Sequence, residues 1–468
     1  MDKKAVTVKR FRYISLALIT TCVLITCLSM PFGNLDEIWV YNVSRSITMG
    51  YIPYSNIRMV FMPLFSYLFA IPLLLGRYLI VYRFTECAFL SLLFILLYTN
   101  IARVTNDYYA LPATLLFIRF NEFATYNHLM MLFAVLAYMY LLKEYSFRRH
   151  FFIGLFAALA ALSRQTSGGI FLVALLICLL IIHIRDGHPS RILSWIAGAF
   201  VPCLIFLIYL LATDSFVAFW DCCLFSLFGF GKGNSIILTS SAGFIVIILT
   251  GIGIDIFFLF RKYSRDILFH FLTLLCLTIT AVPIADPIHL IMGAMFSLIP
   301  ITMLIKSVGN LYLKRYMSYL SSVFICAFVI IMAALNFAST EFSDSYKELR
   351  FIPLSGIEEG YHDLAELKAE YKASGKNVHV FSAASAIISI MGDEADPPYD
   401  LFLTGNLGTK DPVSYAEELC SSADNIIIIH GNYNEENWEN PEGILEYVET
   451  KCTQIGSYGS YIFYQPNV

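Results

Sequence analysis

Charged side chains are scarce in this sequence. Only 14% of its 468 residues are Asp, Glu, Lys or Arg, whereas about a quarter of the residues of a soluble globular protein are charged. Hydrophobic residues make up 58% of the chain. Apolar runs of about 20 residues, the length that crosses roughly 30 Å of hydrocarbon, recur along most of its length. The composition excludes a soluble globular protein and predicts one that crosses a membrane many times.

Other features that the sequence lacks exclude further classes. No basic tract indicates a nucleic-acid partner, and the net charge of −4 says little about partners. The first apolar segment, 14–32, is too long for the core of a signal peptide and is not followed by a small-residue cleavage pattern, so we expect it to remain as an anchor. The glycine-rich stretch "FGFGKGNS" at 228–235 lacks the pattern of a phosphate-binding P-loop. We interpret it as an outer loop.

The loops between the apolar segments differ in charge. Those on one side carry roughly 17 Lys and Arg residues and those on the other about 6, which places the N-terminus in the cytoplasm. The predicted membrane-spanning segments are 14–32, 82–101, 108–121, 128–142, 151–163, 169–184, 192–212, 242–260, 267–284, 289–305 and 318–337.

The basic loops all fall on the cytoplasmic side only if one apolar stretch, 57–76, does not cross the membrane. If it crossed, every later basic loop would lie outside. We therefore predict a helix or hairpin in the outer interface, bent at Pro53, Pro63 and Pro72. Eleven crossings then leave the C-terminus outside.

The composition changes after the last span, so we divide the chain into a transmembrane domain, 1–337, and an extracytoplasmic domain, 338–468. The first outer loop, 33–81, belongs to the transmembrane domain. In the C-terminal domain a helix followed by a strand occurs three times, which favours a small parallel α/β layer. Cys420 and Cys452 in this domain either form a disulfide or remain two free thiols.

The unusual polar residues in or beside the spans all fall on the outer side of this topology. Ionisable groups at membrane depth are costly, so such a set predicts a functional site. The alternative is that outer loops must hold their polar residues somewhere. The residues are Asp36, Glu37, Arg119, Glu122, Arg164, Asp286 and His289.

A carboxylate at the outer lipid surface suits general-base catalysis. It can take a proton from an acceptor hydroxyl or amine as that group attacks an activated carbon. Nearby arginines would stabilise charge on a leaving phosphate. Nucleotide sugars are absent outside the cell, so we expect an activated donor that arrives in the membrane, as a sugar on a polyprenyl phosphate.

The first outer loop, "LDEIWVYNVSRSITMGYIPYSNIRMVFMPLFSYL", resembles that of the type C glycosyltransferases. It is most similar to the branch with the lipid A aminoarabinose transferases and the protein O-mannosyltransferases. Their pattern is an acidic pair after the first span, then Tyr, Gly and a Pro-x-x-x-Tyr element on juxtamembrane helices. The matching residues are Asp36, Glu37, Tyr41, Gly50, Pro63 and Tyr67. The resemblance implies the GT-C fold: about 11 transmembrane helices, outer juxtamembrane helices and an outer soluble domain.

Later elements of the family also have counterparts. Arg83 lies at the start of the next span, where the family has an arginine. Glu122, preceded by Arg119, fills a second acidic position at which Asp is more usual. "LSRQTSGG" places Arg164 in the basic position of another motif. "DPIHLIMGAMFSLIP" resembles the late element that faces the donor phosphate, with His289 but without the family's common Arg or Lys.

The resemblance implies roles for these residues. Asp36 would be the general base of a transfer that inverts the anomeric carbon, and Glu37 would hold the base loop or contact the acceptor. The candidates for support of the first loop and the acceptor are Tyr41, Tyr67 and Glu122. The candidates for the donor phosphate are Arg83, Arg119, Arg164, Lys232 and His289.

Some members of this fold class use a divalent metal near the acidic residues and others do not. No spacing in this sequence requires a cofactor. If a metal is bound, the residues that offer oxygen and imidazole ligands are Asp36, Glu37, Glu122 and His289.

The sequence thus predicts a glycosyltransferase of the bacterial plasma membrane. It would move a sugar from a polyprenyl phosphate to a cell-envelope glycan, lipid or protein. A transporter or flippase for lipid-linked saccharides would show internal repeats and polar residues at the bilayer midplane, where the sequence has only Asp255. A polymerase or ligase of surface glycans would share the substrates but not the Asp-Glu loop.

Overall fold

The computed structural model describes residues 3–226, 238–261, 264–282, 286–307, 311–339, 361–381, 385–395, 408, 412–430 and 443–468. The chain forms two compact units, which are described in turn. The first unit consists of Met1–Met30, Arg83–Phe206 and Ser235–Glu341. The second consists of Pro31–Tyr82, Leu207–Asn234 and Phe342–Val468.

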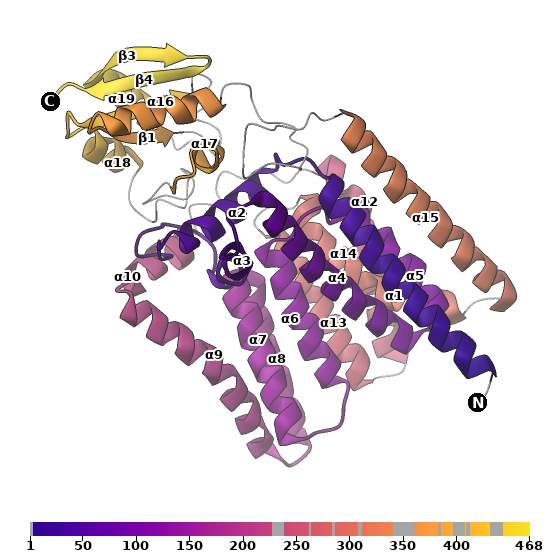
Figure 1. The fold of residues 1–468 in the computed structure, drawn as a ribbon. Helices are drawn as coiled ribbons and strands as arrows, with labels where there is room; N and C mark the ends of the chain where they lie inside the picture. Colours follow the sequence, from indigo (N-terminus) through magenta and orange to yellow (C-terminus); the bar gives the residue numbers. More distant parts are fainter. Residues whose placement is uncertain are drawn as a thin grey trace. The chain divides into compact units, whose positions relative to one another are not determined.

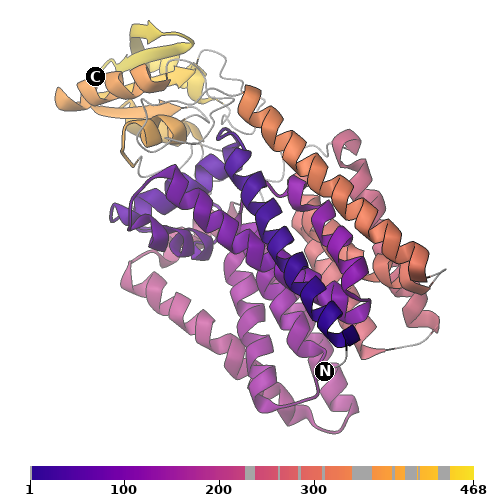
Figure 2. The same ribbon diagram turned by 45° about the vertical axis from the view of Figure 1, so that its right-hand side comes forward.

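The first unit is helical. In Figures 1 and 2 its helices lie side by side, with α6 against α7, α7 against α8, α12 against α13 and α14, and α1 against α5 and α15. Helices α4 and α9 each continue into the second unit. The elements are α1 (Lys3–Ser29), α4 (Leu79–Val104), α5 (Asp107–Leu116), η1 (Ile118–Phe120), α6 (Tyr126–Leu141), α7 (Phe147–Ser163), α8 (Gln165–Arg185), η2 (Pro189–Arg191), α9 (Ile192–Ala212), α12 (Leu238–Arg261), α13 (Arg265–Thr278), η4 (Ile279–Ala281), α14 (Pro287–Ser307) and α15 (Leu311–Ser339).

Within the described residues, seven helices are long and apolar enough to cross a membrane, which makes this a multi-pass membrane protein. They are α1, α4, α8, α9 (with the preceding η2), α12, α14 and α15. The four other predicted spans correspond to shorter helices: α5 has 10 residues, α6 has 16, α7 has 17 and α13 has 14. Each predicted span therefore corresponds to a helix, four of them below the usual spanning length.

Two glycines allow α7 and α9 to approach closely. A Cβ atom on Gly154 of α7 would lie 2.0 Å from the carbonyl oxygen of Trp195, and one on Gly198 of α9 would lie 1.9 Å from that of Phe151. Small residues at helix crossings let backbones pack in this way in membrane proteins. The crossing therefore requires a residue without a side chain on both helices.

The second unit contains the first loop, whose helices are α2 (Leu35–Thr48) and α3 (Leu64–Leu73). The same unit contains α10 (Phe216–Phe219) and the π-helix η3 (Trp220–Phe225). Helix α3 has 10 residues, or about 15 Å of length at 1.5 Å per residue. Like α5, it is shorter than the usual spanning length, and the interfacial position of the stretch 57–76 stays a prediction.

The C-terminal part of the second unit is an α/β domain. A helix and a strand follow one another as predicted, and Gly375 between them has a left-handed backbone conformation. The elements are α16 (Tyr361–Ala373), β1 (Asn377–Phe381), α17 (Ser385–Met391), α18 (Pro412–Leu419), β2 (Asn425–His430), α19 (Ile444–Lys451), β3 (Cys452–Tyr458) and β4 (Tyr461–Pro466).

The prediction of a parallel layer is wrong for two of the three strand pairs in this sheet. The strand order is β1-β2-β4-β3; β1 and β2 are parallel, but β4 is antiparallel to both β2 and β3. The reason is the short turn after β3, where Gly459 takes a φ of +53°. So short a connection joins antiparallel strands, whereas a parallel pair needs a crossover of a dozen or more residues.

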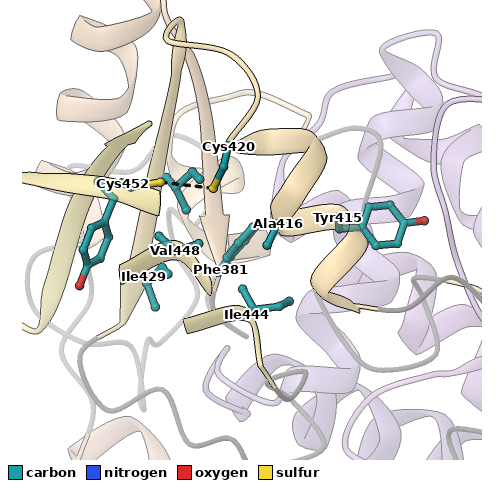
Figure 3. Packing of buried hydrophobic residues seen from close by; sticks show 10 residues of the cluster. Phe381, Tyr415, Ala416, Cys420, Ile429, Ile444, Val448 and Cys452 are labelled. Carbon is teal, nitrogen blue, oxygen red and sulfur yellow. Dashed lines mark hydrogen bonds between the residues drawn. The ribbon is translucent and has the colours of Figure 1, made fainter. Parts of the chain in front are cut away.

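Helices cover both faces of the sheet. Ile427 and Ile429 of β2 pack with α18 and α19, in the cluster of buried residues shown in Figure 3. On α16, Tyr371 packs against Phe463 of β4, with ring centroids 6.2 Å apart. Four consecutive isoleucines of β2 are buried because both sides of this strand are covered.

Candidate active site

The acidic pair predicted from the sequence lies on the first turn of α2. Asn34 caps this helix, because its side-chain oxygen accepts a hydrogen bond of 3.0 Å from the backbone N–H of Asp36. Negative charge in the first turn is stabilised by the positive end of the helix dipole. Asp36 is half-buried and Glu37 is buried. A rigid helix therefore holds one carboxylate at the surface of the second unit and the other inside it.

Two predicted support residues bind the first loop through hydrogen bonds. Tyr41 is fully buried, and its hydroxyl donates to the carbonyl oxygen of Arg77 over 2.8 Å. The hydroxyl of Tyr67 on α3 lies 3.2 Å from that of Tyr209, which donates to the carbonyl oxygen of Pro53 over 2.8 Å. Both tyrosines thus connect distant parts of the second unit.

In the first unit, Arg83 forms an ionic cluster at the start of α4. Its guanidinium is fully buried and lies 3.5 Å from the carboxylate of Glu86. The same guanidinium donates to the carbonyl oxygen of Glu122 over 3.5 Å. Glu86 accepts the backbone N–H of Ala124 over 2.9 Å, while the side chain of Glu122 pairs with Arg119. The structure therefore gathers three predicted residues, with each arginine beside a carboxylate.

A second cluster in the same unit surrounds Arg164, which lies between α7 and α8. Its guanidinium donates to the side-chain oxygen of Asn127 and, over 2.6 Å, to the carbonyl oxygen of Thr280. It also donates to the hydroxyl of Thr166 over 3.1 Å. The hydroxyl of Thr280 donates to the carbonyl oxygen of His289 over 2.6 Å. Thr280 therefore brings Arg164 and His289, two candidates for phosphate binding, into one network.

His289 is held by Asp286 at the start of α14. Nδ1 of its ring lies 2.7 Å from Oδ1 of Asp286, and its backbone N–H donates to the same oxygen over 2.8 Å. Burial raises the pKa of the Asp286 carboxyl, but the hydrogen bonds and charge of His289 together outweigh that effect, and the net pKa is lowered. Asp286 is therefore a carboxylate at neutral pH and orients the imidazole.

Several residues of these networks were not predicted from the sequence. Glu86 lies inside a predicted span, and Asn127, Thr280 and Tyr209 belong to no motif. Their partners are 37 to 156 positions away along the chain. Glu86 alone could have been found from the sequence, because an acidic residue within a membrane span indicates a functional site.

Two further predictions concern Lys232 and a metal site. Lys232 lies outside the described residues. For the metal, no three His, Cys, Asp or Glu side chains gather in an arrangement that could hold an ion in the part of the chain that the structure describes. We derive no step through a metal.

The fold is that of the type C glycosyltransferases. Over 97% of both chains, the structure matches the lipid A aminoarabinose transferase ArnT of Cupriavidus metallidurans bound to undecaprenyl phosphate, with a TM-score of 0.59 and 10% identity. The apo state of ArnT gives a TM-score of 0.55 with 11% identity, over 99% of this chain and 98% of ArnT.

The archaeal oligosaccharyltransferase AglB of Archaeoglobus fulgidus, in complex with an inhibitory peptide and a dolichol-phosphate, is also similar. The match has a TM-score of 0.52 and 10% identity, and covers 97% of this chain and 74% of AglB. Neither the comparison with known protein families nor that with characterised proteins finds a match. At these identities the similarity shows the fold.

Proposed function

We propose that this protein is a glycosyltransferase that uses a polyprenyl-phosphate-linked sugar as donor and an acceptor on the outer face of a bacterial plasma membrane. The observation that carries the proposal is the acidic pair on the first turn of α2, in a chain that has the GT-C fold over nearly its whole length. ArnT binds undecaprenyl phosphate and AglB binds a dolichol-phosphate, which supports a donor of this class.

In the proposed reaction Asp36 is the general base. Its carboxylate takes the proton of an acceptor hydroxyl or amine as that group attacks the anomeric carbon. The bond from the anomeric carbon to the phosphate oxygen breaks, and its electron pair leaves with the polyprenyl phosphate. A single displacement inverts the configuration of the anomeric carbon. We assign Glu37, which is buried on the same turn, the role of holding the base loop or contacting the acceptor.

The leaving phosphate requires cationic partners. We assign this role to Arg164, whose guanidinium is oriented by Asn127 and by the carbonyl oxygen of Thr280. His289, with its ring held by Asp286, supplies a further donor. Groups that are fixed before the reaction stabilise charge at no further cost of reorganisation.

The proposal is tested by incubating the purified protein with a panel of polyprenyl-phosphate sugars that carry label in the sugar, with and without chelator. We expect one donor to release its label to an acceptor, and Asp36→Asn to transfer it about 10²–10⁴-fold more slowly. Asp424→Asn is the matched control, because Asp424 is an exposed acid of the C-terminal domain.

Two outcomes would contradict the proposal. If wild type consumes no donor but moves lipid-linked sugar across proteoliposome bilayers, the protein is a transporter. If it joins lipid-linked saccharides to one another independently of Asp36, it is a polymerase of surface glycans.

A further inference from the structure

An ionic network joins the C-terminal domain to helix α2. Arg45, two turns beyond the acidic pair, has a fully buried side chain, and its Nη2 lies 3.1 Å from Oδ1 of Asp393. Nη1 of Arg45 also lies 3.4 Å from the carbonyl oxygen of Glu394. A buried guanidinium is costly unless it is paired and hydrogen-bonded, so α2 depends on these partners.

The same carboxylate holds a second part of the first loop. Nη2 of Arg77 lies 3.2 Å from Oδ2 and 3.3 Å from Oδ1 of Asp393. The carbonyl oxygen of Arg77 accepts the hydroxyl of Tyr41, one turn before Arg45 on α2. The contacts form a closed circuit from Tyr41 through Arg77 and Asp393 to Arg45, so one carboxylate fixes two successive turns of the helix.

The backbone around Asp393 explains how its side chain reaches α2. The residue follows the end of α17 and has a φ of +50°, a conformation that Asp and Asn tolerate better than most residues do. Its N–H donates to the carbonyl oxygen of Ile390 over 3.2 Å, and that of Glu394 donates to Ser389 over 2.9 Å. Helix α17 itself packs against α2.

The neighbouring residue, Glu394, connects the turn after α17 to helix α16 of the C-terminal domain. Oε2 of Glu394 lies 2.6 Å from Nζ of Lys372 and 3.6 Å from Nζ of Lys368, both on α16. Lys368 is buried. The two adjacent acidic residues thus pair in different directions, Glu394 with α16 and Asp393 with the first loop.

A second contact joins the first loop to the C-terminal domain. Arg58, between α2 and α3, donates to the hydroxyl of Tyr415, and its guanidinium lies over that ring, 5.6 Å from the centroid. Tyr415 belongs to the buried cluster of the C-terminal domain, and its ring points away from the other labelled residues in Figure 3.

We propose that the C-terminal domain is a clamp on the helix that carries the base, with Asp393 as the positioning residue. Asp393 fixes Arg45 and Arg77, and thereby the orientation of α2 and of Asp36 on its first turn. The claim that this orientation serves catalysis rests on the proposed function. The claim that Asp393 holds α2 through Arg45 and Arg77 does not depend on it.

The test compares Asp393→Asn with Asp424→Asn by hydrogen exchange and by kinetics. Asparagine preserves the shape of the side chain and tolerates the left-handed backbone, so the substitution removes chiefly the charge. Asp424 pairs with Lys376 on the exposed surface of the same domain. We expect amides of α2 to exchange at least tenfold faster in Asp393→Asn and at the wild-type rate in Asp424→Asn.

In transfer assays we expect kcat of Asp393→Asn to fall about tenfold while KM for the donor stays within twofold, since the donor site is not touched. Unchanged exchange of α2 would overturn the clamp. Faster exchange with unchanged kcat would overturn the positioning role. If wild type uses no donor, the proposed function fails, and the exchange data still decide on the clamp.

If Asp393→Asn does not fold, Arg77→Gln provides the second variant. It removes the exposed partner of Asp393 and leaves the buried Arg45 in place. A smaller acceleration of exchange in α2 is then expected, and exchange at the wild-type rate would overturn the proposal.

Discussion

At the scale of single residues, the candidate site includes side chains that motifs indicate and side chains that only the fold brings together. Asp36 and Glu37 could be proposed from the sequence because paired carboxylates are conspicuous beside a membrane span. Thr280 was not predictable, because it acts through its carbonyl oxygen and hydroxyl and because Arg164 lies 116 positions away. The sequence therefore identifies the ionisable groups and not the neutral groups that orient them.

Arg164→Lys tests the assignment of the leaving-group partner. Lysine keeps the positive charge but cannot reach Asn127, Thr166 and Thr280 with a planar fork of donors. We expect kcat for sugar transfer to fall by about 10²–10³, the range found when a preorganised donor to transition-state charge is removed. Steady-state kinetics measure the change. Arg185→Lys, at the other end of α8, is the control and should keep wild-type activity.

Asp286→Asn tests the role of the carboxylate beside His289. The net pKa of Asp286 is lowered on folding, so its stabilising contribution is present above the unfolded pKa, about 3.9. It is lost as pH falls through the folded pKa. We expect the variant to be less stable than wild type at pH 7 by about 1–3 kcal/mol, and the difference to shrink as the pH falls below about 4.

Thermal unfolding of the two proteins between pH 3 and pH 7 measures this difference. A difference in melting temperature that is constant over the whole range would show that the charge of Asp286 contributes nothing.

At the scale of elements, the hydrophobic runs predicted where the helices lie, since each expected span corresponds to a helix. The parallel arrangement of the C-terminal sheet was wrong because helix-strand alternation does not reveal a hairpin. The two strands after α19 are separated by Gly459 and Ser460 alone. A glycine in a two-residue connection is typical of a hairpin turn, and Gly459 was therefore the signal that distinguishes an antiparallel pair from a parallel one.

The crossing of α7 and α9 gives a prediction at this scale. In Gly198→Ala the new methyl group would meet the carbonyl oxygen of Phe151, so the helices must separate. Overpacking of this kind costs about 1–3 kcal/mol. Gly169→Ala on α8 is the control, because nothing lies within 4 Å of its added Cβ. Thermal unfolding in detergent should show a lower Tm for Gly198→Ala alone; equal values would contradict the close crossing.

At the scale of the whole molecule, the predicted topology places the C-terminal domain outside the cytoplasm, where thiols oxidise. The sulfur atoms of Cys420 and Cys452 lie 3.2 Å apart in its buried cluster (Figure 3). Burial, with the contact from Cys452, raises the pKa of Cys420 to about 12. Because a free thiol at this site would be protected from reagents in the folded protein, labelling has to be tested on denatured protein.

We therefore predict that these two thiols form a disulfide in the cell, giving two protons and two electrons to a thiol-disulfide oxidant. Protein denatured without reductant should leave both cysteines unlabelled by an alkylating reagent, and mass spectrometry should find the peptides joined. Cys452→Ser should expose Cys420 to the reagent. Full labelling of both cysteines in wild type would contradict the bridge and weaken the outward placement of the domain.

The central claim is that Asp36 is the base of a glycosyl transfer, and the most direct test is the rate of transfer from the productive donor by wild type and Asp36→Asn at equal concentration. Loss of the base is expected to lower kcat by about 10²–10⁴, with donor affinity retained and α2 folded. Transfer by Asp36→Asn at the wild-type rate would contradict it.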